Sequence, residues 1–443
     1  MSEMNEVIEM KRTAAEFVPP AAPTWRTARR AALAAGVGST LEWYDLVTYG
    51  YLAALLGHAF FPSGDSTASL LAAFATFGVG FLARPLGGLL FGAYADRYGR
   101  KASLTLTMIL MATVTGLVGI MPTYETWGTA APVLLVLARV IQGLSAGGEG
   151  TTALAYLVEW APVGRRGVIG SLQSVASGCG LLLGSASVTW ITHSLSAAEL
   201  QAWGWRVPFL LGTLVGPIGY WLRRGVDETP AFRRAISAAP TADERMYSVQ
   251  PWKLSVKAGI FLIFWSVAYY IFLTYMTTFA QRYLHLAPAL VFKANTAALL
   301  LYIVLIPTFG FVSDKVGRKP VLLASCVGIA VLTYPLFKLL LAGVSTPAYV
   351  AILLLFSCML AMYSGPAGAT VAELFPTRIR SKWLGLGYGV SVAIFGGFTP
   401  FVATWLIGAL GTPLAPTYYV IATAIIGGIF VLCLKETAKS ELA

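Results

Sequence analysis

One ten-residue stretch occurs twice in this 443-residue chain, about half a chain apart. It reads Gly-Ala-Tyr-Ala-Asp-Arg-Tyr-Gly-Arg-Lys at residues 92–101 and Gly-Phe-Val-Ser-Asp-Lys-Val-Gly-Arg-Lys at residues 310–319. A second pattern, Glu-x-x-Pro-x-x-x-Arg, begins at Glu159 and again at Glu373. The two patterns recur in the same order at offsets of 218 and 214 residues. This agreement indicates a duplicated half rather than chance.

The composition is that of a membrane protein. Hydrophobic residues make up 57% of the chain and charged residues only 12%, with a mean hydropathy of +0.72. Soluble domains carry about 25% charged residues, and a soluble protein of this composition would expose very large apolar patches. Apolar runs long enough to cross a bilayer recur along the chain. The sequence therefore predicts an all-α membrane protein with twelve transmembrane helices in two pseudo-symmetric six-helix bundles.

The apolar runs and the repeat together predict the domain organisation. Spans are expected at about residues 34–57, 67–93, 103–122, 131–157, 168–193, 205–222, 257–281, 290–312, 320–341, 348–372, 384–409 and 416–434. These give an N-terminal tail (1–33), a first bundle (34–222), a polar linker (223–256), a second bundle (257–434) and a C-terminal tail (435–443).

The charge distribution predicts the orientation in the membrane. If both tails are cytoplasmic, 25 of the 31 Lys and Arg residues fall on the cytoplasmic side, as the positive-inside rule requires. The net charge of +11 is thus a topology signal and not a nucleic-acid site. The first 33 residues lack a cleavable signal pattern, and the separated cysteines and histidines suggest neither disulfides nor a metal site. We expect a multi-pass protein of the bacterial cytoplasmic membrane.

Two six-helix halves, each with a Gly-Asp-basic-Gly-Arg loop between its second and third helices, resemble the major facilitator superfamily. In such a loop the carboxylate can accept hydrogen bonds from a neighbouring helix N-terminus and from the nearby arginine. The resemblance implies that these contacts hold the halves together at the cytoplasmic side in one state and release them in another. The predicted gate residues are Arg84, Gly92, Asp96, Arg97, Gly99, Arg100, Glu159, Arg166, Asp314, Gly317, Arg318, Glu373 and Arg380.

A finer resemblance is to the metabolite–proton symporters of that superfamily. Glu-Trp-Tyr-Asp at residues 42–45 and Arg-Val-Ile-Gln-Gly at 139–143 carry it, together with Trp-Gly-Trp-Arg-Val-Pro at 203–208. The region around residues 372–400 looks most similar to the citrate–proton symporters. The resemblance implies transport by alternating access through a central cavity lined by helices 1, 4, 7 and 10.

Charged residues within the spans are the strongest functional candidates, because each costs at least about 2.5 kcal/mol at a helix centre. Glu42 and Asp45 share one face of the first helix. The rise per residue places them roughly 12 and 17 Å from its cytoplasmic end, and Arg139 lies at a similar depth. A carboxylate whose partner changes during transport can carry a proton. We expect this role of Asp45 first and of Glu42 second, against the alternative of a static pair with Arg139.

Two further charged residues have open assignments. Arg139 can bind a substrate carboxylate with its forked guanidinium or can modulate the proton site. Glu149 can be a second proton site or half of a gate with Arg84, and the gate is favoured. Additional polar contacts to substrate are predicted from Tyr44, Gln173, Tyr270, Tyr275, Tyr363 and Ser364.

The sequence thus predicts a proton-coupled symporter for a small organic acid such as citrate, acting as a monomer without a bound cofactor. No charged residue lies in the middle of the seventh, tenth or eleventh spans, which weakens the tricarboxylate interpretation. The first alternative is a proline or betaine symporter, although that branch is associated with an extended tail and this chain stops shortly after Thr437. An exporter is the second alternative. A receptor or enzyme would need an extramembrane domain or a catalytic constellation.

Overall fold

The computed structural model describes residues 24–63, 65–237 and 250–440. Throughout these residues the regular structure is helical, and they contain no strand. The first half comprises α2 (Trp25–Phe60), α3 (Ser66–Tyr98), α4 (Arg100–Ile120), α5 (Tyr124–Trp127), α6 (Ala130–Trp160), α7 (Arg166–Ser194), α8 (Ala197–Glu199), the π-turn η1 (Leu200–Gly204), α9 (Arg206–Thr213) and α10 (Val215–Arg224). Helix α11 (Pro230–Ser237) follows it in the linker.

The second half comprises α13 (Trp252–Tyr270), η2 (Ile271–Tyr275), α14 (Met276–Tyr283), α15 (Pro288–Val316), α16 (Arg318–Leu341), α17 (Thr346–Glu373), η3 (Thr377–Ile379), α18 (Arg380–Ser391), η4 (Val392–Gly396), α19 (Thr399–Leu410) and α20 (Ala415–Cys433). Within the described ranges ten helical stretches are long and apolar enough to cross a membrane. The charged helix α2 and the interrupted pair α9–α10 bring the count to the predicted twelve.

The first long helix begins earlier than the sequence predicts. It starts at Trp25 instead of near residue 34, because Thr24 forms a capping box with Thr27. The side chain of Thr24 accepts from the backbone N–H of Thr27, and the backbone N–H of Thr24 donates to the Thr27 hydroxyl. These reciprocal bonds satisfy donors that an uncapped helix would leave free. Part of the predicted tail is therefore helical.

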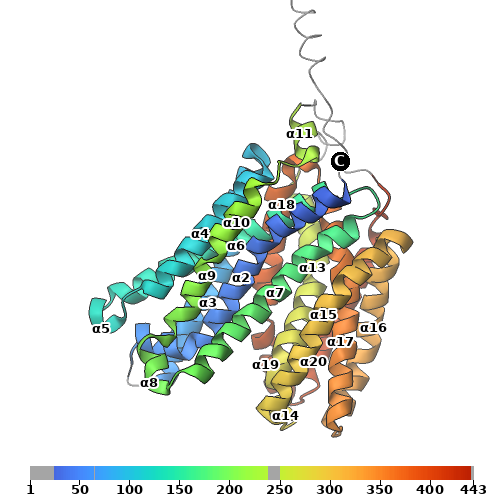
Figure 1. Cartoon of the computed structure of the whole chain (residues 1–443). Helices are drawn as coiled ribbons and strands as arrows, with labels where there is room; N and C mark the ends of the chain where they lie inside the picture. Colours follow the sequence, from blue (N-terminus) through green and yellow to red (C-terminus); the bar gives the residue numbers. More distant parts are fainter. Residues whose placement is uncertain (1–23, 64, 238–249, 441–443) are drawn as a thin grey trace, which may run out of the picture.

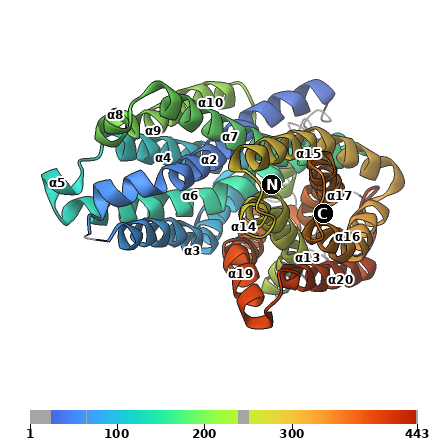
Figure 2. The same ribbon diagram turned by 90° about the horizontal axis from the view of Figure 1, so that it is seen from below.

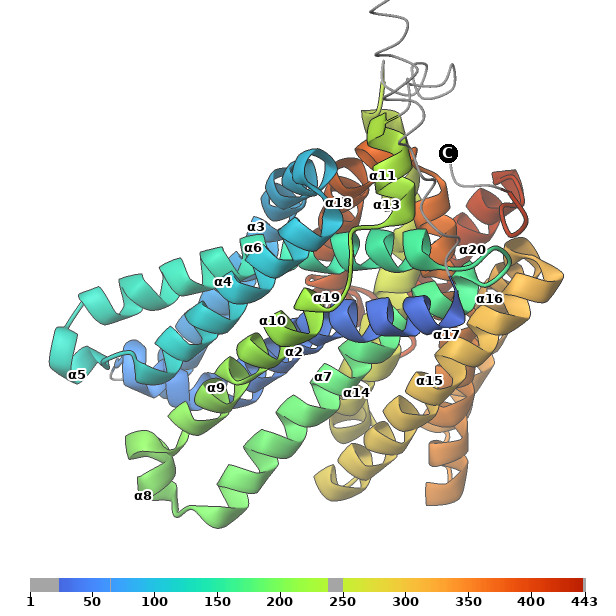
Figure 3. The same cartoon turned by 45° about the horizontal axis from the view of Figure 1, so that its top comes forward.

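The two halves lie side by side, the first on the left and the second on the right in the view of Figure 2. They meet along two seams, α3 against α18 and α7 against α15. Both repeated loops, between α3 and α4 and between α15 and α16, lie at one end of the molecule, which we call the motif end. It is at the top in Figure 1. At the opposite end, α5 and α8 of the first half lie apart from α14 of the second (Figures 1 and 3).

Glycines allow the backbones to touch at both seams. A Cβ added to Gly88 on α3 would lie 2.5 Å from the carbonyl carbon of Gly385 on α18. A Cβ added to Gly310 on α15 would lie 2.7 Å from the carbonyl oxygen of Gly167 on α7. Small residues at interfaces let membrane helices approach this closely. The two halves therefore pack backbone against backbone near the motif end.

Candidate functional site

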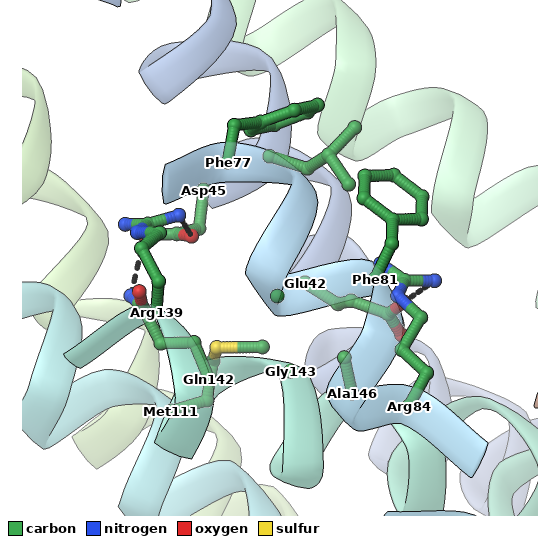
Figure 4. Close-up of a pocket in the computed structure, with 12 residues that line it drawn as sticks. Glu42, Asp45, Phe77, Phe81, Arg84, Met111, Arg139, Gln142, Gly143 and Ala146 are labelled. Carbon is green, nitrogen blue, oxygen red and sulfur yellow. Dashed lines mark hydrogen bonds and ion pairs between the residues drawn. The ribbon is translucent and has the colours of Figure 1, made fainter. Parts of the chain in front are cut away.

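Asp45 lies in a hydrogen-bond network inside the first half (Figure 4). Its Oδ2 accepts from Arg139 Nη1 at 2.9 Å. Its Oδ1 accepts from Gln142 Nε2 at 2.8 Å, from Thr115 Oγ1 at 2.9 Å and from Arg139 Nη2 at 3.4 Å. The Arg139 guanidinium also lies 4.3 Å from the ring centre of Tyr49. The structure thus places Asp45 and Arg139 together, as their predicted depths require, and binds α2, α4 and α6 to each other.

Glu42, one helical turn earlier on α2, has a much simpler environment. Its Oε1 lies 3.0 Å from Nη1 of Arg84 on α3, and both side chains are buried. The Arg84 guanidinium also lies 4.7 Å from the ring centre of Phe81. Figure 4 shows this pair across the cavity from Asp45 and Arg139. That cavity, the ion-pair cavity, is lined by Glu42, Asp45, Leu46, Phe77, Gly80, Phe81, Arg84, Met111, Arg139, Gln142, Gly143 and Ala146.

The predicted gate between Arg84 and Glu149 is not formed. Glu149 Oε1 instead lies 2.6 Å from Arg223 Nη2, and Glu149 Oε2 accepts from the Thr107 hydroxyl. Arg223 also donates through Nε to the carbonyl of Ala34 at 2.9 Å. Arg223 was assigned to the polar linker, but it is buried at the end of α10 because Glu149 offers it a partner inside the bundle.

A second cavity lies between the two halves and is lined mainly by aromatic side chains. We call it the aromatic cavity. Its lining residues are Trp43 on α2, Gln173, Ser174 and Ser177 on α7, Trp265 and Tyr269 on α13, Tyr302 on α15 and Tyr388 on α18. None of these described lining residues carries a charge. The aromatic rings of the cavity come from both halves, and its serine and glutamine side chains come from α7.

The aromatic rings form one continuous cluster across the interface. The Tyr269 ring lies 5.8 Å from Trp43, 5.4 Å from Trp265 and 6.0 Å from Tyr302 between ring centres, and Trp265 lies 6.1 Å from Tyr388. These spacings are typical of interacting aromatic pairs. Hydrogen bonds also orient the cluster.

Ser364 on α17 fixes two of these rings. Its hydroxyl oxygen accepts from Trp265 Nε1 at 2.9 Å and from the Tyr302 hydroxyl at 2.7 Å. Both polar groups thereby have a partner inside the protein, which leaves the ring faces of Trp265 and Tyr302 as their main contribution to the cavity. Ser364 was predicted to contact substrate, and the structure instead places it behind the cavity wall.

The two cavities adjoin around Gly150 on α6. A Cβ added there would lie 3.6 Å from Glu42 Oε2 and 3.7 Å from Gln173 Nε2, so a polar atom from each cavity reaches the same point. Glu42 and Trp43 are also consecutive residues on α2. The Tyr270 hydroxyl, next to Tyr269, is buried and has no hydrogen-bond partner among the described residues. An unsatisfied buried hydroxyl is unusual and can mark a ligand position.

The other predicted substrate contacts have different surroundings. Gln173 lines the aromatic cavity. The Tyr44 hydroxyl donates to the Pro208 carbonyl at 2.7 Å, and the Tyr363 hydroxyl donates to the Phe261 carbonyl at 2.8 Å. Tyr275 accepts a long bond from Thr404 at 3.4 Å. Tyr44 and Tyr363 therefore hold helices together inside their own halves.

At the motif end, each repeated loop caps a helix of the opposite half. Asp96 accepts from the backbone N–H groups of Ser381 (3.1 Å) and Lys382 (2.9 Å) at the start of α18. Asp314 accepts from those of Gly167 (2.8 Å) and Val168 (2.9 Å) at the start of α7. Helix N-termini carry partial positive charge and unsatisfied donors, so a carboxylate stabilises them.

Buried ion pairs reinforce these caps. Asp96 pairs with Arg100 at 3.0 Å, and Asp314 with Arg318 at 2.7 Å. Glu159 receives Arg100 from its own half at 3.2 Å and Arg380 from the other half at 2.8 Å. Correspondingly, Glu373 lies 3.4 Å from Arg318 and 3.7 Å from Arg166. Arg97 differs from the other predicted gate residues, since it is exposed and lies over the Tyr98 ring.

A third repeat, Glu-Thr at residues 228–229 and 436–437, completes the network and was not identified from the sequence. Glu228 accepts from the Lys101 backbone N–H at 3.0 Å, and Glu436 accepts from that of Arg318 at 2.8 Å. Thr229 and Thr437 donate to Glu159 and Glu373, respectively, each at 2.5 Å. The signal was present in the sequence, because the dipeptide recurs at an offset of 208 residues, close to those of the longer motifs.

The glycines of the repeated loops fit this arrangement. Gly99 and Gly317 have φ values of 105° and 106°, which side chains with a Cβ rarely adopt. A Cβ at these positions would lie 2.2 Å from Glu228 Oε2 and 2.7 Å from Glu436 Oε2. The loop therefore needs glycine both for its backbone conformation and for the approach of the capping glutamate.

Comparison with known proteins identifies the family. The sugar (and other) transporter family matches residues 31–260, and the major facilitator superfamily matches residues 284–442. The glycine betaine/proline/ectoine/pipecolic acid transporter OusA of Dickeya dadantii (strain 3937) is 37% identical, over 94% of this chain and 84% of the relative. The proline/betaine transporter of Escherichia coli (strain K12) is 34% identical, over 94% and 85%.

Solved structures agree in fold. The proton:xylose symporter XylE bound to 6-bromo-6-deoxy-D-glucose superposes with a TM-score of 0.80 at 19% identity, covering 94% of this chain and 98% of that chain. A crystal structure of a D-xylose-proton symporter gives a TM-score of 0.67, also at 19% identity, covering 94% and 100%.

These findings correct one prediction and confirm others. The assignment to citrate-like organic acids is wrong, because relatives that match over most of the chain are named as proline and betaine transporters. The helical fold and the transporter class, as opposed to an enzyme, are confirmed. The chain is a multi-pass membrane protein that belongs to the major facilitator superfamily.

Proposed function

We propose that this protein is a secondary transporter that carries a small zwitterionic osmolyte of the proline and betaine class across the bacterial cytoplasmic membrane, together with a proton. The observation that carries the proposal is the aromatic cavity between the halves, whose described lining residues are uncharged. A quaternary ammonium group cannot donate a conventional N–H hydrogen bond, so it is held mainly by the negative faces of aromatic rings. A tricarboxylate would meet those same faces unfavourably.

The position of the cavity also supports transport. Trp43 belongs to the first half, whereas Trp265, Tyr302 and Tyr388 belong to the second. A ligand at the interface of two repeats can be exposed to either side as the repeats rock against each other. At the motif end, which the positive-inside rule assigns to the cytoplasm, the Asp96 and Asp314 caps close this conformation.

Proton coupling is the energy source that the buried charges favour. Glu42 with Arg84 lies beside the aromatic cavity, and Asp45 with Arg139 lies across the ion-pair cavity from that pair. Buried charges in transmembrane helices are costly and are typical of proton and substrate pathways. Gradient-driven accumulation therefore needs no bound cofactor.

The proposal is tested by binding measurements on the purified protein with one cavity variant and one matched control. Trp265→Leu removes a ring from the cavity, whereas Trp190→Leu removes a ring from α7 that is 59% exposed. Cation–π contacts in desolvated sites contribute about 2 kcal/mol, so Trp265→Leu should weaken glycine betaine binding roughly tenfold or more. Trp190→Leu should bind as the wild type does. Equal binding by both variants would contradict the assignment of the site.

A further inference from the structure

The two buried carboxylates of α2 differ sharply in how they are held. Asp45 accepts from three different side chains, those of Arg139, Gln142 and Thr115. Glu42 has Arg84 as its one ion-pair partner within the part of the chain that the structure describes, and no other residue of that part donates a hydrogen bond to its carboxylate. Replacing the partner of Asp45 would break a network, whereas Glu42 has one contact to exchange.

Arg84 is fixed at the meeting point of the halves. A Cβ added to Gly147 on α6 would lie 2.0 Å from the Arg84 carbonyl oxygen, and one added to Gly389 on α18 would lie 3.3 Å from the Arg84 carbonyl carbon. Its backbone is thus in contact with both halves, while Phe81 supports its guanidinium. The end of the side chain, in contrast, is held by Glu42.

The surroundings supply a place for a second carboxylate. The Tyr270 hydroxyl, which has no hydrogen-bond partner among the described residues, comes from the opposite half and lies within electrostatic range of Glu42 and Arg84. Trp43 follows Glu42 directly and lines the aromatic cavity. In glycine betaine a single methylene group separates the ammonium from the carboxylate, so its two ends need binding groups that adjoin.

Resting on the proposed function, we propose that Arg84 is the subsite for the carboxylate of the zwitterion and that the substrate displaces Glu42 from it. The quaternary or secondary ammonium group then lies against the rings of the aromatic cavity, and the Tyr270 hydroxyl donates to the substrate carboxylate. A guanidinium binds a carboxylate through two parallel N–H donors. Binding of the substrate carboxylate to Arg84 therefore releases Glu42 from the same arginine.

Displacement of Glu42 from Arg84 couples substrate binding to proton uptake. A buried carboxylate that loses its cationic partner takes up a proton, because the charge is no longer offset. Glu42 accepts this proton from water on the open side, while Arg84 stays protonated and exchanges one carboxylate for another. The substrate carries no net charge, so each cycle moves one osmolyte and one proton. The one positive charge that crosses the membrane is that of the proton.

The other groups around Glu42 do not replace Arg84. Glu149 on α6 is paired with Arg223, and Asp45 is held by Arg139. Tyr270 on α13 and Tyr388 on α18 also interact electrostatically with Glu42, but both are neutral phenols. Arg84 is therefore the cation whose loss leads to protonation of Glu42.

The test uses two ligands that share a quaternary ammonium group, glycine betaine with a carboxylate and choline without one. Binding is measured by calorimetry, and proton uptake on binding by a pH indicator in weakly buffered detergent solution. Wild-type protein should take up about one proton per glycine betaine bound and none with choline. Arg84→Gln should lose roughly tenfold or more in glycine betaine affinity while retaining that for choline, which also shows that the variant is folded.

Glu42→Gln should bind glycine betaine but take up no proton, whereas the control Glu125→Gln, at an exposed residue of α5, should take up a proton as the wild type does. Proton uptake by Glu42→Gln, or equal loss of both ligands in Arg84→Gln, would overturn this inference alone. Wild-type protein that binds neither glycine betaine nor proline would overturn the proposed function, and this inference with it.

Discussion

Arg380 of the second half donates from Nη1 to Oε1 of Glu159 in the first half at 2.8 Å, and both side chains are fully buried. The same carboxylate receives Arg100 from its own half. This contact joins the repeated motifs of the two halves through one carboxylate. It breaks only if the motif end opens, so it ties the stability of the protein to its conformation.

Removing this cross-half contact should destabilise the closed protein. Arg380→Met removes one of the two arginines that offset the buried charge of Glu159. Removing one partner of a buried pair costs about 3–5 kcal/mol. The expected result is a clearly lower Tm in detergent. The matched control is Arg233→Met, whose pair with Asp227 is 3.7 Å long and largely exposed. Exposed pairs contribute about 0–1 kcal/mol, so an equal loss in both variants would contradict the account.

An added methyl group should be poorly tolerated on α3 where it meets α18, and well tolerated at a glycine of α3 that has open space around it. A Cβ at Gly88 would clash with the Gly385 backbone, whereas a Cβ at Gly78 on the same helix has nothing within 4 Å. Gly88→Ala should push the halves apart at the motif end and reduce uptake. Gly78→Ala should transport normally, with stability unchanged or raised by up to about 1 kcal/mol. Cysteine labelling at Ser381→Cys in each background measures opening, and unchanged labelling in Gly88→Ala would argue against a backbone seam.

Asp45→Asn should lower the stability of the protein without abolishing proton uptake. Asparagine keeps the shape of Asp45 but removes the charge that balances Arg139, so the free energy of unfolding should fall by about 3–5 kcal/mol. Since proton binding is assigned to Glu42, folded Asp45→Asn protein should still take up about one proton with each glycine betaine. Loss of that proton in folded protein would return the role to Asp45.

The two capping glutamates should respond differently to pH. Burial raises the pKa of Glu228 above its usual range. Burial also acts upward on Glu436, but backbone N–H groups, led by that of Arg318, outweigh it and the net pKa shift is downward. Glu436 therefore stabilises the fold above the ordinary glutamate pKa of 4.5, and this stabilisation is lost as the pH falls through its lower folded value. The raised pKa of Glu228 has the opposite effect on stability, because ionisation of this buried carboxyl destabilises the fold as the pH rises.

Glu436→Gln should consequently lower the Tm near pH 7, and its difference from the wild type should shrink below about pH 4. Glu228→Gln should be less harmful near pH 7. The measurement is Tm between about pH 3 and 8 for both variants. A larger loss for Glu228→Gln at neutral pH, or a pH-independent loss for Glu436→Gln, would contradict the assignment.

The sequence was informative where a feature is periodic or repeated. The offset of the two long motifs predicts the duplicated halves, and the shared depth of Asp45 and Arg139 predicts their contact. The aromatic cavity could not be found this way, because Trp43, Trp265 and Tyr388 come from distant helices and aromatic residues are common in membrane spans. The pairing of Glu149 with Arg223 was missed because a basic residue at a helix end is ordinarily a topology signal.

The substrate was the largest error, and its cause is physical. Buried carboxylates and arginines are common to transporters of many cargoes, so the motifs around Glu42 and Arg139 indicate coupling without identifying what is carried. Cargo selection depends on the shape and charge of a cavity assembled from both halves. Only the absence of charge in the middle of the second-half spans pointed away from a tricarboxylate.

The most direct test of the osmolyte assignment is uptake of radiolabelled glycine betaine into proteoliposomes with an imposed inward proton gradient. We expect gradient-driven accumulation of glycine betaine that is reduced by excess unlabelled proline, is unaffected by excess citrate and is abolished in Glu42→Gln. Uptake of labelled citrate under the same gradient, with no accumulation of glycine betaine or proline, would contradict the osmolyte assignment.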